Sequence, residues 1–103
     1  MSQFIALDLG AESGRAVVGR LDDDRLSLEE AYRFPNGPVR VLGSLHWDPL
    51  HLFHDMKQGL SKISHQYGTD FSAVGVDTWG LDYALLDRDG NMVGNPYCYR
   101  DPR

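Results

Sequence analysis

The residues best suited to chemistry lie near the N-terminus, in the stretch Asp8 to Arg15, which reads Asp-Leu-Gly-Ala-Glu-Ser-Gly-Arg. Its glycines, Gly10 and Gly14, permit a tight turn and close approach of a ligand to the backbone. Successive backbone N–H groups in such a turn can form a concave anion site, to which Ser13 and Arg15 add a hydroxyl and a positive charge. Asp8 could hold a hydrated Mg²⁺ beside it. These are the parts that phosphoryl transfer requires.

Two widespread phosphate-binding motifs do not fit this stretch. No Gly-Lys-Ser/Thr follows the first glycine at the Walker A spacing, and Gly10 and Gly14 do not match Gly-x-Gly-x-x-Gly. From the glycines alone, an ordinary tight turn with a solvated carboxylate stays open as an alternative.

Short strands are expected on both sides of this turn. The apolar run Phe4 to Leu9 predicts a first strand that is buried on both faces, and 15–21 predicts a second strand. A third strand is expected over 25–34, after an acidic turn at 22–24 that we interpret as solvated. Short turns between them make the three strands antiparallel.

A helix is expected after a loop that begins at residue 35. We predict a loop with one short extended piece over 39–45. Asp48 is then a typical N-cap and Pro49 a first helical residue, while Gly68 closes the helix. One apolar stripe follows helical spacing, at Phe53, Met56, Leu60, Ile63 and Tyr67.

The helix carries one possible set of metal ligands. His51, His54 and Asp55 fall within one turn, but no fourth ligand is near, so a polar helix face is the favoured interpretation. We treat Trp47, just before the helix, as a packing residue.

The helix allows the next strand, over 71–77, to pair in parallel with an earlier one. A hairpin follows, with a strand over 82–87, a turn at Asp89-Gly90 and a return at 92–93. The predicted fold is an α/β mixed sheet in the order β-β-β-α-β, then a β-hairpin.

Composition narrows the function. The 103 residues have a net charge of −5, which disfavours a nucleic-acid partner, and 42% are hydrophobic, as in a folded domain. No apolar run is long enough to span a membrane, so no membrane partner is expected. Cys98 is the single cysteine, which suits a reducing cytoplasm. The oligomeric state is left open.

Several segments together resemble the FGGY family of sugar kinases. The stretch 8–15 is similar to the family's first phosphate motif, and 75–82, Gly-Val-Asp-Thr-Trp-Gly-Leu-Asp, is similar to the segment of members that act on L-rhamnulose. The segments 33–37, 46–48 and 99–103 also fit. The resemblance covers essentially the whole chain and implies the N-terminal part of an actin/hexokinase-like domain, related to ribonuclease H.

For the nucleotide, the resemblance implies ATP and Mg²⁺ as cofactors. The ATP phosphates would lie against Ala11, Glu12, Ser13, Gly14 and Arg15, and Mg²⁺ would contact Asp8 through water. Glu12 departs from the small polar residue expected there. Its negative charge would repel phosphate unless the side chain points outward.

For the sugar, the resemblance implies a ketose, most closely L-rhamnulose converted to L-rhamnulose 1-phosphate. Gly80 would contact the sugar through its backbone, and Trp79 and Asp82 would shape the pocket, with Asp101 and Arg103 at its edge. An aromatic wall and carboxylates suit a polyol.

No catalytic base is expected within these residues, since the family's general base lies beyond Arg103. We therefore predict an incomplete N-terminal kinase domain over 1–103, without the C-terminal domain and inactive alone. Two other hypotheses about the function stay open. One is a ribonuclease H-like metal nuclease using Asp8 and Asp77. The other is a non-catalytic truncated chain.

Overall fold

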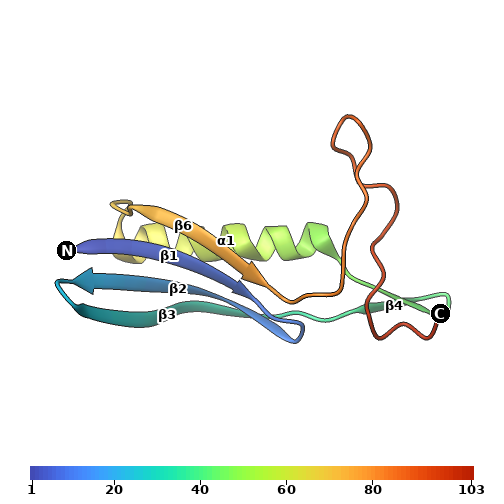
Figure 1. Ribbon diagram of the computed structural model, residues 1–103, viewed down its shortest axis with the longest axis horizontal. Coiled ribbons are helices and arrows are strands. Elements are labelled where there is room, and N and C mark those ends of the chain that lie inside the picture. The colour runs from blue at the N-terminus through green and yellow to red at the C-terminus, as the bar shows by residue number, and fades with distance from the viewer.

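A computed structural model describes residues 1–103. Its main element is a four-stranded sheet in the order β3-β2-β1-β6, with helix α1 against one face (Figure 1). The first three strands are antiparallel neighbours, and β6 pairs in parallel with β1 after the helix. The elements are β1 (Ser2–Leu9), β2 (Ser13–Asp22), β3 (Arg25–Pro35), α1 (Pro49–Tyr67) and β6 (Ala73–Thr78). The predicted β-β-β-α-β mixed sheet is confirmed.

The hydrophobic core lies between this sheet and α1. Ile5 and Leu7 of β1 point toward the helix, where Ile63 is fully buried. Because strand residues alternate in direction, the other face of β1 carries Ala6 and Asp8, which stay exposed or half-buried. The predicted burial of both faces of 4–9 is therefore wrong for this chain, since α1 covers only one face.

The ends of α1 are set by its caps, as predicted. The Asp48 carboxylate accepts a 3.1 Å hydrogen bond from the backbone N–H of His51, and Pro49 begins the helix. At the other end Gly68 has a φ of 84° and donates its N–H to the carbonyl of Ser64 at 3.1 Å. That conformation favours glycine.

One member of the predicted apolar stripe on α1 is wrong. Phe53 is 57% exposed, whereas Asp55, Gly59 and Ile63 occupy the buried line. The helix comes close to the sheet at Gly59, where a Cβ would lie 2.9 Å from the Cβ of Ala16. Met56, Leu60 and Tyr67 pack against the core, but Phe53, nearer the start of the helix, lies outside it.

The segment predicted as a loop over 39–45 is more regular than expected. It forms a two-stranded hairpin, β4 (Val39–Val41) and β5 (Ser44–His46). The turn between them has two left-handed residues, Leu42 with φ 49° and Gly43 with φ 85°.

The strand β3 has a β-bulge opposite Ala16 and Val17 of β2. The bulge explains why apolar and polar residues do not alternate cleanly along β3.

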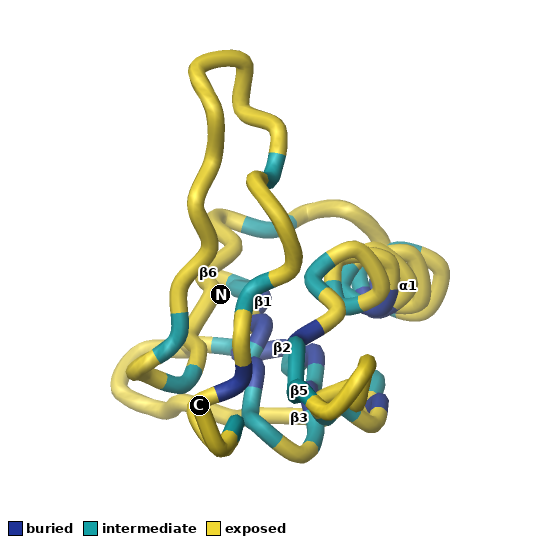
Figure 2. Tube along the Cα trace, turned by 90° about the vertical axis from the view of Figure 1, so that its right-hand side faces the viewer, coloured by how far each residue is buried: buried dark blue, intermediate teal, exposed yellow.

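The predicted strand over 82–87 is not present. Leu86 and Met92 form a single isolated bridge, although the turn between them is found, with Gly90 at φ 86°. Leu85 and Leu86 are each 62% exposed, so no second layer stabilises a strand there. Figure 2 shows this segment as an exposed arm that projects from the sheet.

The helix α1 does not combine the length and hydropathy that a membrane-spanning helix requires.

Candidate nucleotide and sugar site

The turn between β1 and β2 is closed by its own backbone. The N–H of Gly10 donates to the carbonyl of Ser13 at 2.9 Å, with Ala11 and Glu12 at the tip. A Cβ on Gly10 would lie 2.7 Å from that carbonyl oxygen, so the turn requires glycine there. The predicted phosphate residues 11–15 thus lie together on one tight hairpin.

Phe34 near the end of β3 and Asn36 just after it support this hairpin. The family resemblance includes their segment, 33–37, but predicts no role for either residue. Asn36 donates its side-chain N–H to the carbonyl of Gly10 at 2.9 Å and its backbone N–H to that of Glu12 at 3.0 Å. The ring of Phe34 fills the space in which a Cβ on Gly14 would stand. Asn36 thus holds the carbonyls of Gly10 and Glu12 in place.

Four charged residues form a row across the sheet beside the hairpin. In the strand registers, Arg33 is opposite Arg15, Arg15 is opposite Asp8, and Asp8 is opposite Asp77. Residues directly opposite one another project from the same face. Because Leu7 and Leu9 face α1, this row lies on the other face of the sheet.

The side-chain contacts within this row of charged residues are long. An Arg15 nitrogen lies 3.5 Å from an oxygen of Asp8, and the guanidinium also reaches the Ser13 carbonyl at 3.4 Å. The Nε of Arg15 is buried without a partner. Arg33 donates to the Ser13 hydroxyl at 3.3 Å. Two guanidinium groups therefore converge on the hairpin, and that of Arg33 is also paired with Glu30 at 2.7 Å.

The structure fits a water-mediated metal contact better than direct chelation. No group of three or more His, Cys, Asp or Glu side chains is close enough to hold a metal ion. Asp8 is 45% exposed and its only protein partner is Arg15, which leaves acceptor positions open to the water shell of Mg²⁺. On α1, His51 instead pairs with Asp55 at 3.4 Å. His51 is exposed as expected for a polar helix face, but Asp55 lies on the buried line of the helix, so the polar-face interpretation is wrong for Asp55.

Glu12 lies at the tip of the hairpin. Its side chain is 84% exposed, and the carboxylate is 3.9 Å from a guanidinium nitrogen of Arg100. Water and Arg100 therefore screen its charge, as the outward arrangement requires.

In the segment predicted to bind the sugar, the side chains of Trp79 and Asp82 are hydrogen-bonded. The Trp79 indole N–H donates to Oδ2 of Asp82 at 2.8 Å, and the indole N–H of Trp47 donates to the same oxygen at 2.6 Å. Gly80 is open, because a Cβ there would meet no atom of the chain within 4 Å. The structure thus joins Trp79 and Asp82 and adds Trp47, which we had interpreted only as a packing residue.

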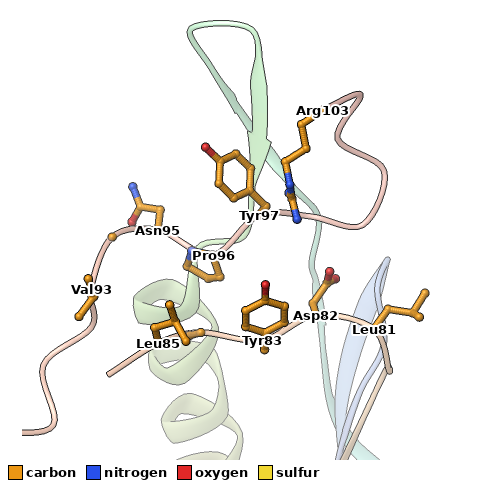
Figure 3. Close-up of a pocket in the computed structure, with 11 residues that line it drawn as sticks. Leu81, Asp82, Tyr83, Leu85, Val93, Asn95, Pro96, Tyr97 and Arg103 are labelled. Atoms are coloured by element: carbon orange, nitrogen blue, oxygen red, sulfur yellow. The ribbon is translucent and has the colours of Figure 1, made fainter. Parts of the chain in front are cut away.

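A cavity of about 230 Å³ lies beside Asp82. Its walls come from the two sides of the exposed arm, 81–85 and 93–97, and from Arg103. Figure 3 shows the Asp82 carboxylate and the Tyr83 hydroxyl pointing toward the segment that carries Tyr97. The guanidinium of Arg103 lies 4.1 Å from the centre of the Tyr97 ring. Neither Trp79 nor Gly80 lines this cavity.

Asp101 has a structural partner on each oxygen. Oδ1 accepts from the backbone N–H of Leu45 at 2.7 Å, and Oδ2 accepts from that of Arg103 at 3.1 Å. The hydrogen bond from Leu45 is the main cause that holds the pKa of Asp101 below its usual value. Asp101 therefore ties the last residues to β5.

The β1–β2 hairpin and the segment 79–82 leave the sheet at the same edge. Leu9, where β1 ends, is opposite Thr78, where β6 ends, and the two strands are parallel. Ligands of open α/β sheets bind at the carboxyl ends of such strands. The topology therefore brings the phosphate hairpin and 79–82 to one edge.

No protein-family model matches the chain, but known proteins do. The rhamnulokinase of Bacteroides thetaiotaomicron is 44% identical over 99 residues, which are 96% of this chain and 20% of that protein. The rhamnulokinase of Bacillus subtilis is 41% identical over 100 residues, which are 97% of this chain and 20% of that protein. The chain thus spans about a fifth of the length of the curated relatives it matches.

Solved structures agree on the fold. A xylulose kinase from Rhodospirillum rubrum superposes with a TM-score of 0.77 at 23% identity, covering 98% of this chain and 21% of that chain. A gluconate kinase from Lactobacillus acidophilus gives 0.76 at 12% identity, covering 93% and 19%. The predicted fold class is confirmed, and the predicted resemblance to sugar kinases is confirmed by the rhamnulokinase relatives.

Proposed function

We propose that this chain is the N-terminal part of an ATP-dependent sugar kinase of the FGGY family, and that the whole protein phosphorylates L-rhamnulose to L-rhamnulose 1-phosphate. One observation carries the proposal: identity of 39–44% to rhamnulokinases extends over nearly the whole chain. The geometry supports it, because an anion-binding hairpin and a carboxylate with aromatic neighbours leave the sheet at one edge.

In this proposal the hairpin binds the phosphates of ATP. The backbone of Ala11 to Gly14, the Ser13 hydroxyl and the Arg15 guanidinium act as donors, and Arg33 adds positive charge nearby. Asp8 orients the water shell of Mg²⁺. Bound Mg-ATP supplies the phosphoryl group and neutralises charge as it transfers. The chain's own part is to hold the phosphates in line with the sugar, since positioning supplies much of catalysis.

Sugar binding is assigned to 79–82. Gly80 lets the ketose approach the backbone, Asp82 accepts hydrogen bonds from hydroxyls, and Trp79 forms an apolar wall. In the reaction a hydroxyl oxygen of the sugar would form the new O–P bond as the bond between the γ-phosphorus and the β,γ-bridging oxygen of ATP breaks, which releases ADP. The hydroxyl proton passes to a base that we place outside residues 1–103.

We also propose that residues 1–103 form only part of a domain. All six residues of β6 are exposed, including Val74 at 52% and Val76 at 57%. The radius of gyration is 16.1 Å, against roughly 13 Å for a compact domain of this size. Further chain of the whole kinase would cover β6 and supply the base and the adenosine pocket. We expect this chain alone to be inactive, and the whole kinase to be cytoplasmic.

One observation supports the alternative hypothesis of a nuclease: Asp8 and Asp77 are opposite each other in the parallel register of β1 and β6. Two carboxylates are fewer than a two-metal site uses, and the net charge of −5 opposes a nucleic acid. The kinase relatives favour sugar phosphorylation over this alternative.

The test is an ADP-release assay on the full-length protein that carries this chain, with Mg-ATP and L-rhamnulose. L-fuculose, D-xylulose and D-gluconate serve as competing substrates. We expect turnover to be highest with L-rhamnulose, and Asp8→Ala to reduce turnover strongly with a smaller effect on the melting temperature. Absence of turnover with every sugar would refute the kinase proposal, and a preference for another sugar would refute the assignment of substrate.

A further inference from the structure

Trp47 lies far from Trp79 and Asp82 in sequence but contacts both. Its indole N–H is 2.6 Å from Oδ2 of Asp82, and its ring centre is 4.5 Å from that of Trp79, with the planes at 49°. Trp47 is only 6% exposed. It is therefore a buried side chain whose single polar atom is committed to Asp82.

This arrangement fixes the orientation of the carboxylate. An indole nitrogen is a donor only, so Trp47 and Trp79 can satisfy their N–H groups here only by donating to Asp82. Both donate to Oδ2, while Oδ1 has no partner within the chain. Since Asp82 also lines the 230 Å³ cavity, one oxygen is held and the other stays available to a ligand.

The backbone around Trp47 is itself held in place. The N–H of Trp47 donates to the carbonyl of Pro96 at 2.9 Å, and the N–H of Cys98 donates to the carbonyl of Leu45, also at 2.9 Å. Asp48, the next residue, caps α1. The ring is thus placed by β5, by the segment 96–98 and by the helix, three elements that meet only in the folded chain.

We propose that Trp47 is a positioning residue of the sugar site: it orients the Asp82 carboxylate and supports the Trp79 ring, without itself contacting the sugar. This inference rests on the proposed function, because it assigns Asp82 to a ketose. It adds a residue outside the segment 79–82. A residue of this kind improves binding by ordering a side chain before the ligand arrives.

The experiment compares Trp47→Phe with wild type in the full-length kinase. Phe keeps an aromatic ring but removes the N–H. We expect the KM for the ketose to rise by roughly tenfold, the effect of losing one hydrogen bond to a charged group. The KM for ATP should change less than twofold. As a control, Phe71→Leu loosens the core near the other end of α1 and should lower the melting temperature without changing the KM for the sugar.

A double-mutant cycle separates positioning from general damage. In an Asp82→Ala background Trp47 has no carboxylate to orient, so adding Trp47→Phe should change the KM for the sugar less than twofold. If the fold increases in the KM for the sugar of the two single variants multiply in the double variant, the inference is wrong. It is also wrong if Trp47→Phe alone leaves the KM for the ketose unchanged.

If Trp47→Phe does not fold, 3-benzothienylalanine at position 47 provides the same test, because its ring system has the size of indole but no N–H. Its KM for the ketose should also rise by roughly tenfold. An unchanged KM would overturn the inference. If wild type phosphorylates no ketose, the proposed function fails instead, so the two failures are distinguishable.

Discussion

Gly80→Ala separates a role in binding from a role in folding. A Cβ at position 80 meets no atom of residues 1–103 within 4 Å, and Gly80 is not among the glycines with positive φ. Replacing such a glycine by alanine changes stability by about 0 to +1 kcal/mol, because the unfolded chain loses entropy. We therefore expect the melting temperature of the full-length kinase to stay constant or to rise slightly.

The same methyl group should obstruct the sugar. If the ketose contacts the Gly80 backbone, an added methyl overpacks that contact at a cost of about 1–3 kcal/mol. That range corresponds to a rise in the KM for the ketose of roughly 5- to 150-fold. The KM for ATP should not change, since the nucleotide is assigned to the hairpin between β1 and β2.

Thermal melting and steady-state kinetics on the same preparations provide the measurement. Gly37→Ala is the matched control, because a Cβ at Gly37 also meets nothing within 4 Å and this glycine too has no positive φ. It should behave like wild type in both assays. A stable Gly80→Ala protein with an unchanged KM for the sugar would show that the ketose does not approach this backbone.

Three further predictions concern the elements that support the site. Asn36→Ala removes the 2.9 Å bond to the Gly10 carbonyl, and the loss of about 1 kcal/mol should raise the KM for ATP roughly fivefold in steady-state assays while the KM for the sugar stays constant. Gly14→Ala places a Cβ inside the Phe34 ring and should lower the free energy of unfolding of the full-length protein in urea by about 1–3 kcal/mol. Adding Phe34→Leu should restore part of that stability. If the free-energy losses of the two single variants simply add, the packing argument is wrong. A backbone N–H of β5 holds the pKa of Asp101 below its usual value, so the stability that this carboxylate contributes is present above the ordinary aspartate pKa of about 4 and is lost as the pH falls through the lower pKa of the folded state. Melting temperatures from pH 7 to pH 2 should therefore fall less steeply for Asp101→Asn than for wild type, and parallel curves would refute the assignment.

Local signals predicted most of the fold. The strands β1 to β3 follow from apolar runs and short turns, and α1 from Asp48, Pro49 and Gly68, all of which act within a few residues of themselves. The errors in the predicted fold occur where contacts between residues far apart in the sequence determine the structure. The close approach of Gly59 on α1 to Ala16 of β2 is a contact that apolar spacing does not contain. Phe53 fits the apolar spacing but lies outside the core, because spacing does not show how far along the helix the core extends.

The site was predicted to a similar extent. The hairpin 8–15 and the pair Trp79 and Asp82 were found from residue types and from family resemblance. The resemblance includes the segments that carry Trp47 and Asn36, but their roles at the site were not predicted, because their partners lie 35 and 26 residues away in the chain. No local pattern marks such a contact. The hairpin β4–β5 was missed because its turn carries Leu42 at positive φ, in place of the Asn-Gly or Asp-Gly pair that signals such a turn.

The charge row across the sheet adds a physical reason for the division of roles in the proposed kinase. Arg33 and Arg15 lie on the β3 and β2 side, and Asp8 and Asp77 on the β1 and β6 side, in one register line. Phosphate oxygens gain energy beside guanidinium groups, and a hydrated cation gains energy beside carboxylates. Mg-ATP presents both kinds of charge together, so Arg15 and Arg33 would hold its phosphates, and Asp8 and Asp77 would favour its hydrated metal ion. Because 79–82 continues directly from β6, the sugar would meet the phosphate on the metal side of this row, where charge from the transferring group is neutralised.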